Sequence, residues 1–416
     1  MNPLGRSSAR AALSVVAAAA ISLAALEAPP SAAGLRASVD SGVPSATGAS
    51  ALAGVAGHHQ RKRLPALRTH VVMPHLDIPW DISVMPSGAW LVTERDRQRI
   101  LLHLPGGGRR VLSNGPAGIW SSGETGLMSI VHDPRVARNN RFYTCNGWER
   151  NGHHDIRVLA WRLNRGRTHA RIVDTLVSGI QITSGRHGGC RLRFDRAGAL
   201  WVGTGDSTVG TNPQNLHSLN GKLLRLNRFS GRPWPTNPWV HAPNRHKRFI
   251  FNYGHRNVQG LAVRPGGGIW SVEHGTDRDD EVNRGARGGN FGWNPVPGYD
   301  ESTPMTDFSL PGRQIGARWR SGFPTLATSG AVWVRGKKWG RYNGTLAVCA
   351  LKASELLFMK FDRHGRFRWM RTPPAMRGRY GRLRSVALTH NHDLLVTTSN
   401  GGGGSGGDRV IRVSPR

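Results

Sequence analysis

Short apolar runs that follow polar turns recur along most of the chain and predict β-strands. A turn rich in Pro, Asp, Asn or Gly precedes each run, as in PSGAWLV and DRAGALWV. The six copies cover residues 86–92, 139–145, 195–202, 265–272, 342–348 and 391–396. Each copy is followed by another strand candidate, such as ILLHL after the first and ELLFMKF after the fifth. Short runs bounded by turn residues are typical of strands rather than helices.

The spacing of these copies predicts the fold. They recur at intervals of about 50 to 75 residues, which suits four-stranded β-propeller blades with some long loops. We therefore predict an all-β, six-bladed β-propeller, in which each blade buries its faces against its neighbours. The alternative is a β-sandwich with turns that are alike by chance. The run at 408–413 is expected to complete a blade with the start of the domain, and the aperiodic segment 299–322 to be a functional or disordered loop.

The N-terminal residues have a different pattern and predict an exported protein. Arg6 and Arg10 precede an apolar run at 11–26 that is short for a membrane span, and small residues follow at 31–33. Residues 1–33 are thus predicted to be a signal peptide, with an uncleaved anchor as the alternative. Residues 34–63, rich in Ala, Gly and Ser, are predicted to be a disordered linker, and residues 64–416 the propeller domain. We expect a secreted, periplasmic or cell-envelope location.

The amino-acid composition and net charge indicate which kinds of molecule the protein is expected to bind. The 54 glycines and 14 tryptophans favour a β-protein with many turns. The formal net charge of +32 predicts attraction to anions such as acidic wall polymers, anionic lipids or an anionic cofactor. No Lys/Arg cluster is flanked by stacking aromatics, so we expect no nucleic-acid partner. Electrostatic association with anionic cell-surface polymers remains an expectation.

The densest group of chemically useful residues lies at 253–293. It combines two histidines, an Arg-Asn pair and four carboxylates between glycines, in the order YGHRNVQG, EHG, TDRDDE and GGNFGW. Carboxylate and carbonyl oxygens suit calcium, although the spacing is not that of an EF-hand. The alternative is a polar loop between strands.

Two further positions could carry chemistry. His187 lies beside glycines and could face a cleft as a general base; the alternative is a structural hydrogen-bonding histidine. Arg382 and Arg384 are two residues apart, which in a strand places both side chains on one face, where they could bind a polyanion. The alternative for this pair is a basic strand edge.

Taken together, these motifs make the sequence resemble the soluble quinoprotein glucose/sorbosone dehydrogenases. The motifs that carry the resemblance are GETGLMSI, RHGGCRLRFD, LWVGTGD, SLNGKLLRL, YGHRNVQGLA, EHG, DDEVN, GGNFGW and GRLRSV, and they span residues 76–413. The resemblance implies a six-bladed propeller that binds pyrroloquinoline quinone (PQQ) and calcium and oxidises the C1 hydroxyl of aldoses. It implies a sugar substrate and an external electron acceptor.

The resemblance also assigns roles to individual residues. The catalytic pair would be the base His187 and the quinone-contacting Arg256. The cofactor-binding residues would be Glu124, Arg256, Asn257, Lys352, Arg382 and Arg384. The carbonyls of Gly275 and Thr276 would hold the catalytic calcium, and Glu281 with the carbonyl of Phe291 a second calcium.

The chain departs from the family pattern at several positions. Glu124 stands where some members have glutamine, and its charge could repel an anionic cofactor. Thr276 replaces a common proline, Cys190 a glycine and Ser385 a common aspartate. Two alternatives to the dehydrogenase are therefore a non-catalytic propeller that binds a polysaccharide or protein, and a calcium-dependent lactone hydrolase.

The three cysteines predict one disulfide. Without a C-x-x-C pair, a cysteine zinc site or redox motif has no support. Cys145 and Cys190 belong to neighbouring repeats, which a ring brings together, and Cys190 replaces a family glycine. We predict that these two are bonded and that Cys349 is an unpaired buried thiol; the alternative is three separate buried cysteines.

Overall fold

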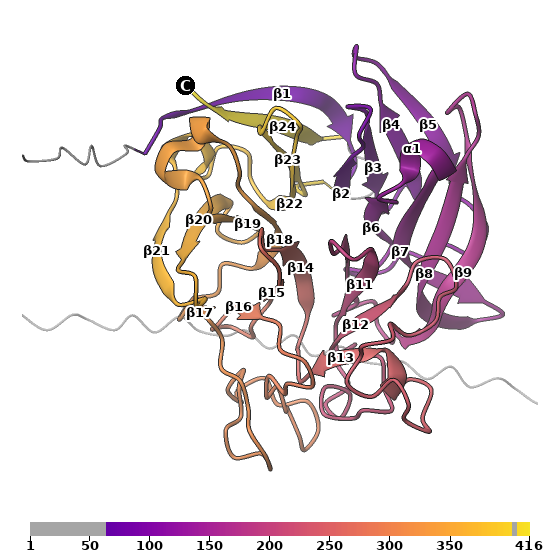
Figure 1. Ribbon diagram of the computed structural model, residues 1–416, viewed down its shortest axis with the longest axis vertical. Helices are drawn as coiled ribbons and strands as arrows, with labels where there is room; N and C mark the ends of the chain where they lie inside the picture. The colour runs from indigo at the N-terminus through magenta and orange to yellow at the C-terminus, as the bar shows by residue number, and fades with distance from the viewer. Residues whose placement is uncertain (1–63, 402–405) are drawn as a thin grey trace, which may run out of the picture. The chain divides into compact units, whose positions relative to one another are not determined.

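The described part of the chain is built almost entirely from β-sheet. The computed structural model describes residues 64–401 and 406–416; the predicted signal peptide and linker lie outside them. In this part, 24 strands form six four-stranded sheets (Figure 1). This arrangement confirms the predicted six-bladed β-propeller.

The sheets follow one another along the chain. The first contains β2 (Pro79–Val84), β3 (Trp90–Glu94), β4 (Arg99–His103) and β5 (Arg109–Asn114). The second contains β6 (Leu127–His132), β7 (Arg141–Arg150), β8 (His153–Leu163) and β9 (Ala170–Gln181), with the short helix α1 (Val136–Asn139) before β7. The third contains β10 (Gly189–Phe194), β11 (Ala199–Thr204), β12 (Lys222–Asn227) and β13 (Ile250–Tyr253), with the 3-10 turn η1 (Lys247–Phe249) before β13.

The remaining three sheets repeat this order. The fourth contains β14 (Val258–Val263), β15 (Ile269–Glu273), β16 (Glu281–Arg284) and β17 (Trp319–Arg320). The fifth contains β18 (Thr328–Trp333), β19 (Leu346–Ala350), β20 (Glu355–Phe361) and β21 (Phe367–Arg371), with η2 (Lys337–Tyr342) before β19 and η3 (Pro374–Met376) after β21. The sixth contains β22 (Leu383–Leu388), β23 (Leu394–Thr398), β24 (Asp408–Pro415) and β1 (Leu67–Leu76).

The repeat found in the sequence corresponds to the same strand in every sheet. The six predicted strands coincide with β3, β7, β11, β15, β19 and β23, which are the second strands of their sheets. The preceding turn is the hairpin that joins each of them to the first strand. The repeat is regular because each sheet needs a polar turn before its buried second strand, although the connection is longer in the second sheet, where it contains α1, and in the fifth, where it contains η2.

The first strands of the sheets line the centre of the ring. β2 contacts β6, and contacts continue through β10, β14, β18 and β22 back to β2. The ring is closed within the sixth sheet, where β1 pairs antiparallel with β24. The expectation that the C-terminal run completes a blade with the start of the domain is therefore confirmed.

A buried charged group ties the inner strands together. Asp81 on β2 is fully buried and pairs with Arg191 on β10 at 2.6 Å. The hydroxyls of Ser129 on β6 and Ser385 on β22 donate to the same carboxylate at 2.6 and 2.7 Å. A buried charge is tolerable only when it is paired and hydrogen-bonded, as this one is.

One long connection breaks the regular pattern. Between β16 of the fourth sheet and β18 of the fifth, segment 299–322 contains only the two-residue strand β17. Its side chains reach the site described below. Among the described residues, none of the helices has the length and apolar character needed to cross a membrane.

Candidate active site

The predicted base is held by an acid that lies across the same β-hairpin. His187 lies just before β10, with its side chain buried and its backbone at a φ of 52°. Its Nδ1 is 2.9 Å from Oδ1 of Asp206, which follows β11. Since a carboxylate only accepts hydrogen bonds, the proton lies on Nδ1 and the lone pair on Nε2. Such a histidine can accept a proton at Nε2.

Asp206 is itself oriented by the long loop. Its Oδ2 accepts hydrogen bonds from the Trp293 indole at 2.7 Å and from the Tyr299 hydroxyl at 2.6 Å. The Tyr299 hydroxyl is also 2.9 Å from Nδ1 of His187. Burial, followed by the charge of Asp206, raises the pKa of Tyr299 far above its ordinary value, so this hydroxyl stays a donor. The result is a fixed orientation of the His187 ring.

A second group of polar side chains lies next to the histidine. Asn257 donates to Glu124 at 3.0 Å, and Gln259 donates to the same carboxylate at 3.4 Å. Gln259 in turn accepts from Arg384 at 3.1 Å. Burial alone would raise the pKa of Glu124, but its neighbours, chiefly His274 and His187, outweigh burial and keep the pKa below its ordinary value.

These side chains fit an anionic ligand such as PQQ. Arg256 and Arg384 each have a buried guanidinium nitrogen without a hydrogen-bond partner in the described part of the chain. Unpaired buried donors are costly, and an anion supplies the missing acceptors. Glu124 is the one carboxylate in this group, and the amides of Asn257 and Gln259 already bind it. The departure from the family pattern is therefore compensated by neighbouring donors.

Arg256 has a second partner on the long loop. Its guanidinium pairs with Glu301, and it lies over the Trp293 ring at 5.6 Å. Arg186 is 4.0 Å from the same Glu301 carboxylate. The Arg256 side chain is 5% exposed, whereas Glu301 is 42% exposed. Glu301 thus lies at the outer side of the site and neutralises a predicted cofactor ligand.

Two of the predicted cofactor residues are placed differently from the others. Arg382 is exposed, while Arg384 on β22 is buried. Lys352 is exposed in the turn after β19, and among the described residues its side chain makes no hydrogen bond or ion pair. The structure brings Glu124, His187, Arg256, Asn257 and Arg384 together, and leaves Lys352 unconnected to them.

The calcium predictions concern the loop after β15. No donor within the described residues reaches the backbone carbonyls of Gly275 or Thr276, so both oxygens are available to a hard cation. The described residues contain no cluster of three or more His, Cys, Asp or Glu side chains that could hold a metal. The calcium role of these two carbonyls stays a prediction.

The second predicted calcium site contains a buried pair of acids. Glu281 lies opposite Glu273 across β15 and β16, and Arg320 is 3.3 Å from its carboxylate. The Phe291 ring stacks on His255, which hydrogen bonds to Glu273 at 2.8 Å. Burial and then Glu273 raise the pKa of Glu281 to about 8. With Arg320 already paired to Glu281, the calcium role of Glu281 and Phe291 stays a prediction.

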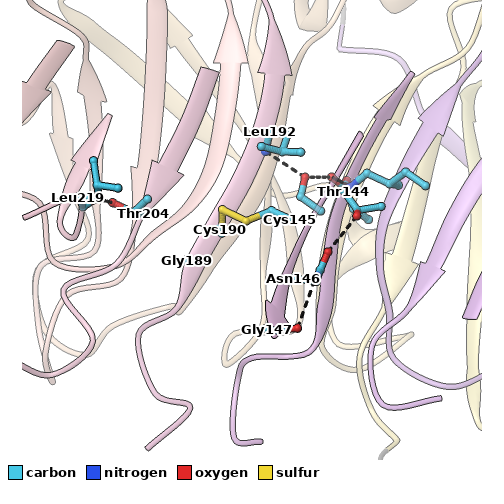
Figure 2. Close-up of a disulfide and its surroundings, with 12 residues drawn as sticks. Thr144, Cys145, Asn146, Gly147, Gly189, Cys190, Leu192, Thr204 and Leu219 are labelled. Carbon is cyan, nitrogen blue, oxygen red and sulfur yellow. Dashed lines mark hydrogen bonds between the residues drawn. A yellow bond between two sulfur atoms is a disulfide. The ribbon is translucent and has the colours of Figure 1, made fainter. Parts of the chain in front are cut away.

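The predicted disulfide is present beside the site. Cys145 on β7 and Cys190 on β10 are bonded, with their Cα atoms 6.1 Å apart (Figure 2). Cys349 is a free, buried thiol, and burial raises its pKa well above the ordinary value. The bond joins two neighbouring sheets three residues after His187.

Several residues of the site were not found from the sequence. They are Asp206, Gln259, His274, Tyr299 and Glu301. Asp206 ends the motif LWVGTGD, and Gln259 lies in YGHRNVQG. Both therefore belong to motifs that the sequence shows, but the sequence assigns them no role. Tyr299 and Glu301 lie in the aperiodic loop, where no pattern indicates which side chains turn inward.

Comparisons with known proteins match most of the propeller domain. The family model described as Glucose / Sorbosone dehydrogenase matches residues 76–407. The aldose sugar dehydrogenase YliI of Escherichia coli K12 is 27% identical over 307 residues, which cover 71% of this chain and 81% of the relative.

Two solved structures share the fold over their whole length. The PQQ-bound form of aldose sugar dehydrogenase from Streptomyces coelicolor is 26% identical, with a TM-score of 0.70 and coverage of 85% of this chain and 100% of that one. The soluble aldose sugar dehydrogenase of Escherichia coli, in its apo-form, is 25% identical, with a TM-score of 0.74 and coverage of 84% and 100%.

Proposed function

Since the chain belongs to the glucose/sorbosone dehydrogenase family, we propose that it is an exported PQQ- and calcium-dependent enzyme that oxidises the C1 hydroxyl of an aldose to a lactone. The observation that carries the proposal is the oriented His187 next to buried arginines with unpartnered nitrogens. The PQQ bound by the Streptomyces relative supports the same choice of cofactor.

Different residues of the chain would bind the cofactor and the calcium ion. Arg256, Asn257 and Arg384 would hold the carboxylates and carbonyls of the cofactor, because guanidinium groups bind such oxygens in pairs. The carbonyls of Gly275 and Thr276 would hold calcium. Bound PQQ supplies an acceptor for the hydride from C1, and calcium a Lewis acid that polarises it.

His187 would manage the proton of the reaction. Its Nε2 would accept the proton of the C1 hydroxyl, and Asp206 would stabilise the imidazolium that results, since it accepts from Nδ1 at 2.9 Å. Buried Trp293 and the Tyr299 hydroxyl would keep the Asp206 carboxylate in place. An external acceptor would then take the two electrons, and a dye can replace it in an assay.

The test is reconstitution of the purified protein. PQQ and calcium are added, and dye reduction is followed with several aldoses. We expect dye reduction that needs PQQ, calcium and His187. His187→Ala should bind PQQ, but its turnover should be lower by about 100-fold or more, as for loss of a positioned base.

Other outcomes would overturn the proposal. Tight PQQ binding without dye reduction by any aldose would favour a non-catalytic propeller that binds a polysaccharide or protein. Hydrolysis of lactones without PQQ or dye would favour a lactone hydrolase. Full turnover by His187→Ala would remove this residue from the mechanism.

A further inference from the structure

The outer strands of the second sheet carry a row of arginines. Arg141 on β7 lies directly opposite Arg162 on β8, and Arg162 lies directly opposite Arg171 on β9. Side chains at directly opposite positions share a face of the sheet. Three like charges in one row repel each other, and such pairs destabilise a sheet. The arrangement therefore calls for a counter-charge.

A pocket opens beside Arg162 and Arg171 of this row. It has a volume of about 500 Å³ and lies where α1 meets the β8–β9 hairpin. Its lining includes Arg138, Asn139, Arg162, Arg165, His169 and Arg171, and no carboxylate. The four arginines are exposed and bring their charges to one opening.

No acid of the described chain supplies the counter-charge. Throughout residues 64–401 and 406–416, none of Arg138, Arg162, Arg165 and Arg171 takes part in an ion pair. Asp133 is already bound to Arg228, and Asp174 lies opposite Ala160 on β8 without an ion pair.

Arg141 completes the row from the inner side. Two of its guanidinium nitrogens are buried without a hydrogen-bond partner in the described chain. Its guanidinium lies over the rings of Tyr143 and Phe229 at 5.8 and 5.5 Å, and Phe229 is 44% exposed. Ring contacts hold this arginine in place but provide no negative charge.

We propose that this pocket binds a phosphate group, either as the free ion or within a polyphosphate chain. Arginine forks bind phosphate oxygens in pairs, and a tetrahedral phosphate has acceptors for several forks, whereas a carboxylate has two oxygens. The bound charge would relieve the repulsion within the row. The pocket lies on the outer strands of its sheet, apart from the inner-strand ends that form the candidate active site, and the inference is independent of the proposed dehydrogenase.

Isothermal titration calorimetry tests the proposal, with inorganic phosphate as the probe and the ionic strength held constant with chloride. We expect saturable binding to the full-length protein. In Arg162→Gln/Arg171→Gln, phosphate affinity should fall about tenfold or more, because charge-assisted hydrogen bonds are lost. The same variant should be at least as stable as the wild type in chloride alone, because the repulsion is relieved.

Two control variants make the test specific. Arg363→Gln/Arg366→Gln removes two exposed arginines elsewhere that are in no ion pair of the described chain, and it should bind phosphate like the wild type. Arg384→Gln changes the candidate active site and should also leave this binding unchanged. Equal phosphate affinity in the wild type and Arg162→Gln/Arg171→Gln would overturn the proposal.

A second titration separates the two sources of phosphate. Linear polyphosphate that binds much more tightly than inorganic phosphate, through the same two arginines, would identify a polymer as the ligand. Equal affinity per phosphate would identify the free ion. Saturable binding of neither would contradict the site.

Discussion

His187 is oriented by residues that are distant from it in the chain. Asp206 and Tyr299 both lie 2.9 Å from its Nδ1, at separations of 19 and 112 residues. The carboxylate needs a proton on Nδ1, and this leaves Nε2 free as the base. Which nitrogen of the His187 imidazole can act as the base therefore depends on the hydrogen bond made by the other nitrogen.

Asp206→Asn should reverse this orientation. The new amide can donate to Nδ1, which would move the imidazole proton to Nε2 and remove the free lone pair. We expect turnover to fall about 100-fold or more with little change in PQQ affinity, as for loss of a general base. Steady-state kinetics with a PQQ titration measure both quantities. Unchanged turnover would show that Asp206 has no part in orienting the base.

Glu301 is a second single residue whose charge affects the affinity for the cofactor. Its carboxylate neutralises Arg256, so a cofactor carboxylate must compete with it. Because Glu301 is 42% exposed, water screens the pair, and Glu301→Gln should tighten PQQ binding by only about three- to fivefold. Fluorescence titration of cofactor-free protein provides the measurement. Glu355→Gln, an acid paired with Arg377 in the fifth sheet, should leave the affinity unchanged. Weaker binding by Glu301→Gln would mean that Glu301 supports the cofactor site.

At the scale of elements, one covalent bond joins the second and third sheets next to the site. It connects β7 to β10 across a sequence separation of 45 residues. Neighbouring sheets otherwise touch through side-chain packing and a few backbone hydrogen bonds, such as the one from the Leu127 amide to the Arg95 carbonyl. The bond therefore limits the movement of the segment that carries His187.

Removing the bond with Cys145→Ala/Cys190→Ala should cost stability. The chain-entropy account gives a loss of about 3–4 kcal/mol for a loop of this size. Chemical denaturation followed by tryptophan fluorescence measures the change. Cys349→Ala is the matched control, because it removes a buried thiol that forms no bond, and it should cost clearly less. Thiol titration of the unfolded, non-reduced wild type should find one free thiol; three would contradict the bond.

At the scale of the whole domain, Asp81 connects inner strands that lie far apart in the chain. Arg191 and Arg193 come from β10, Ser129 from β6 and Ser385 from β22. Burial alone would raise the pKa of Asp81, but the two arginines and the hydrogen bonds lower it far below its ordinary value. The ionised carboxylate is therefore part of the folded state.

Asp81→Asn tests this contribution. Breaking a buried ion pair leaves Arg191 without its partner, so the free energy of unfolding at pH 7 should fall by about 3–5 kcal/mol. Because the folded pKa is depressed, the contribution is complete above the unfolded aspartate pKa of about 4 and is lost as pH falls below it. Denaturation at several pH values should show a shallower acid decline in the variant. An equally steep decline in both proteins would contradict this role.

The periodic part of the fold could be predicted from the sequence. Turns and short apolar runs recur because every sheet needs a polar turn before its buried second strand, so the six second strands were found at their places. The ring closure and the disulfide followed from that repeat. His187, Arg256, Asn257, Arg384 and Glu124 were found through motifs, and the structure brings them together.

Only the tertiary structure decided which partners these residues have. Asp206 lies across the β10–β11 hairpin from His187, and Tyr299 and Glu301 reach the site from a loop without periodicity. Hydrogen bonds across 19 to 112 residues leave no local pattern, because they depend on strand register and on how a loop of another sheet meets the hairpin. The row formed by Arg141, Arg162 and Arg171 is likewise visible only once strand register is known. Local sequence determines strands and turns, whereas contacts between sheets determine the chemistry at their ends.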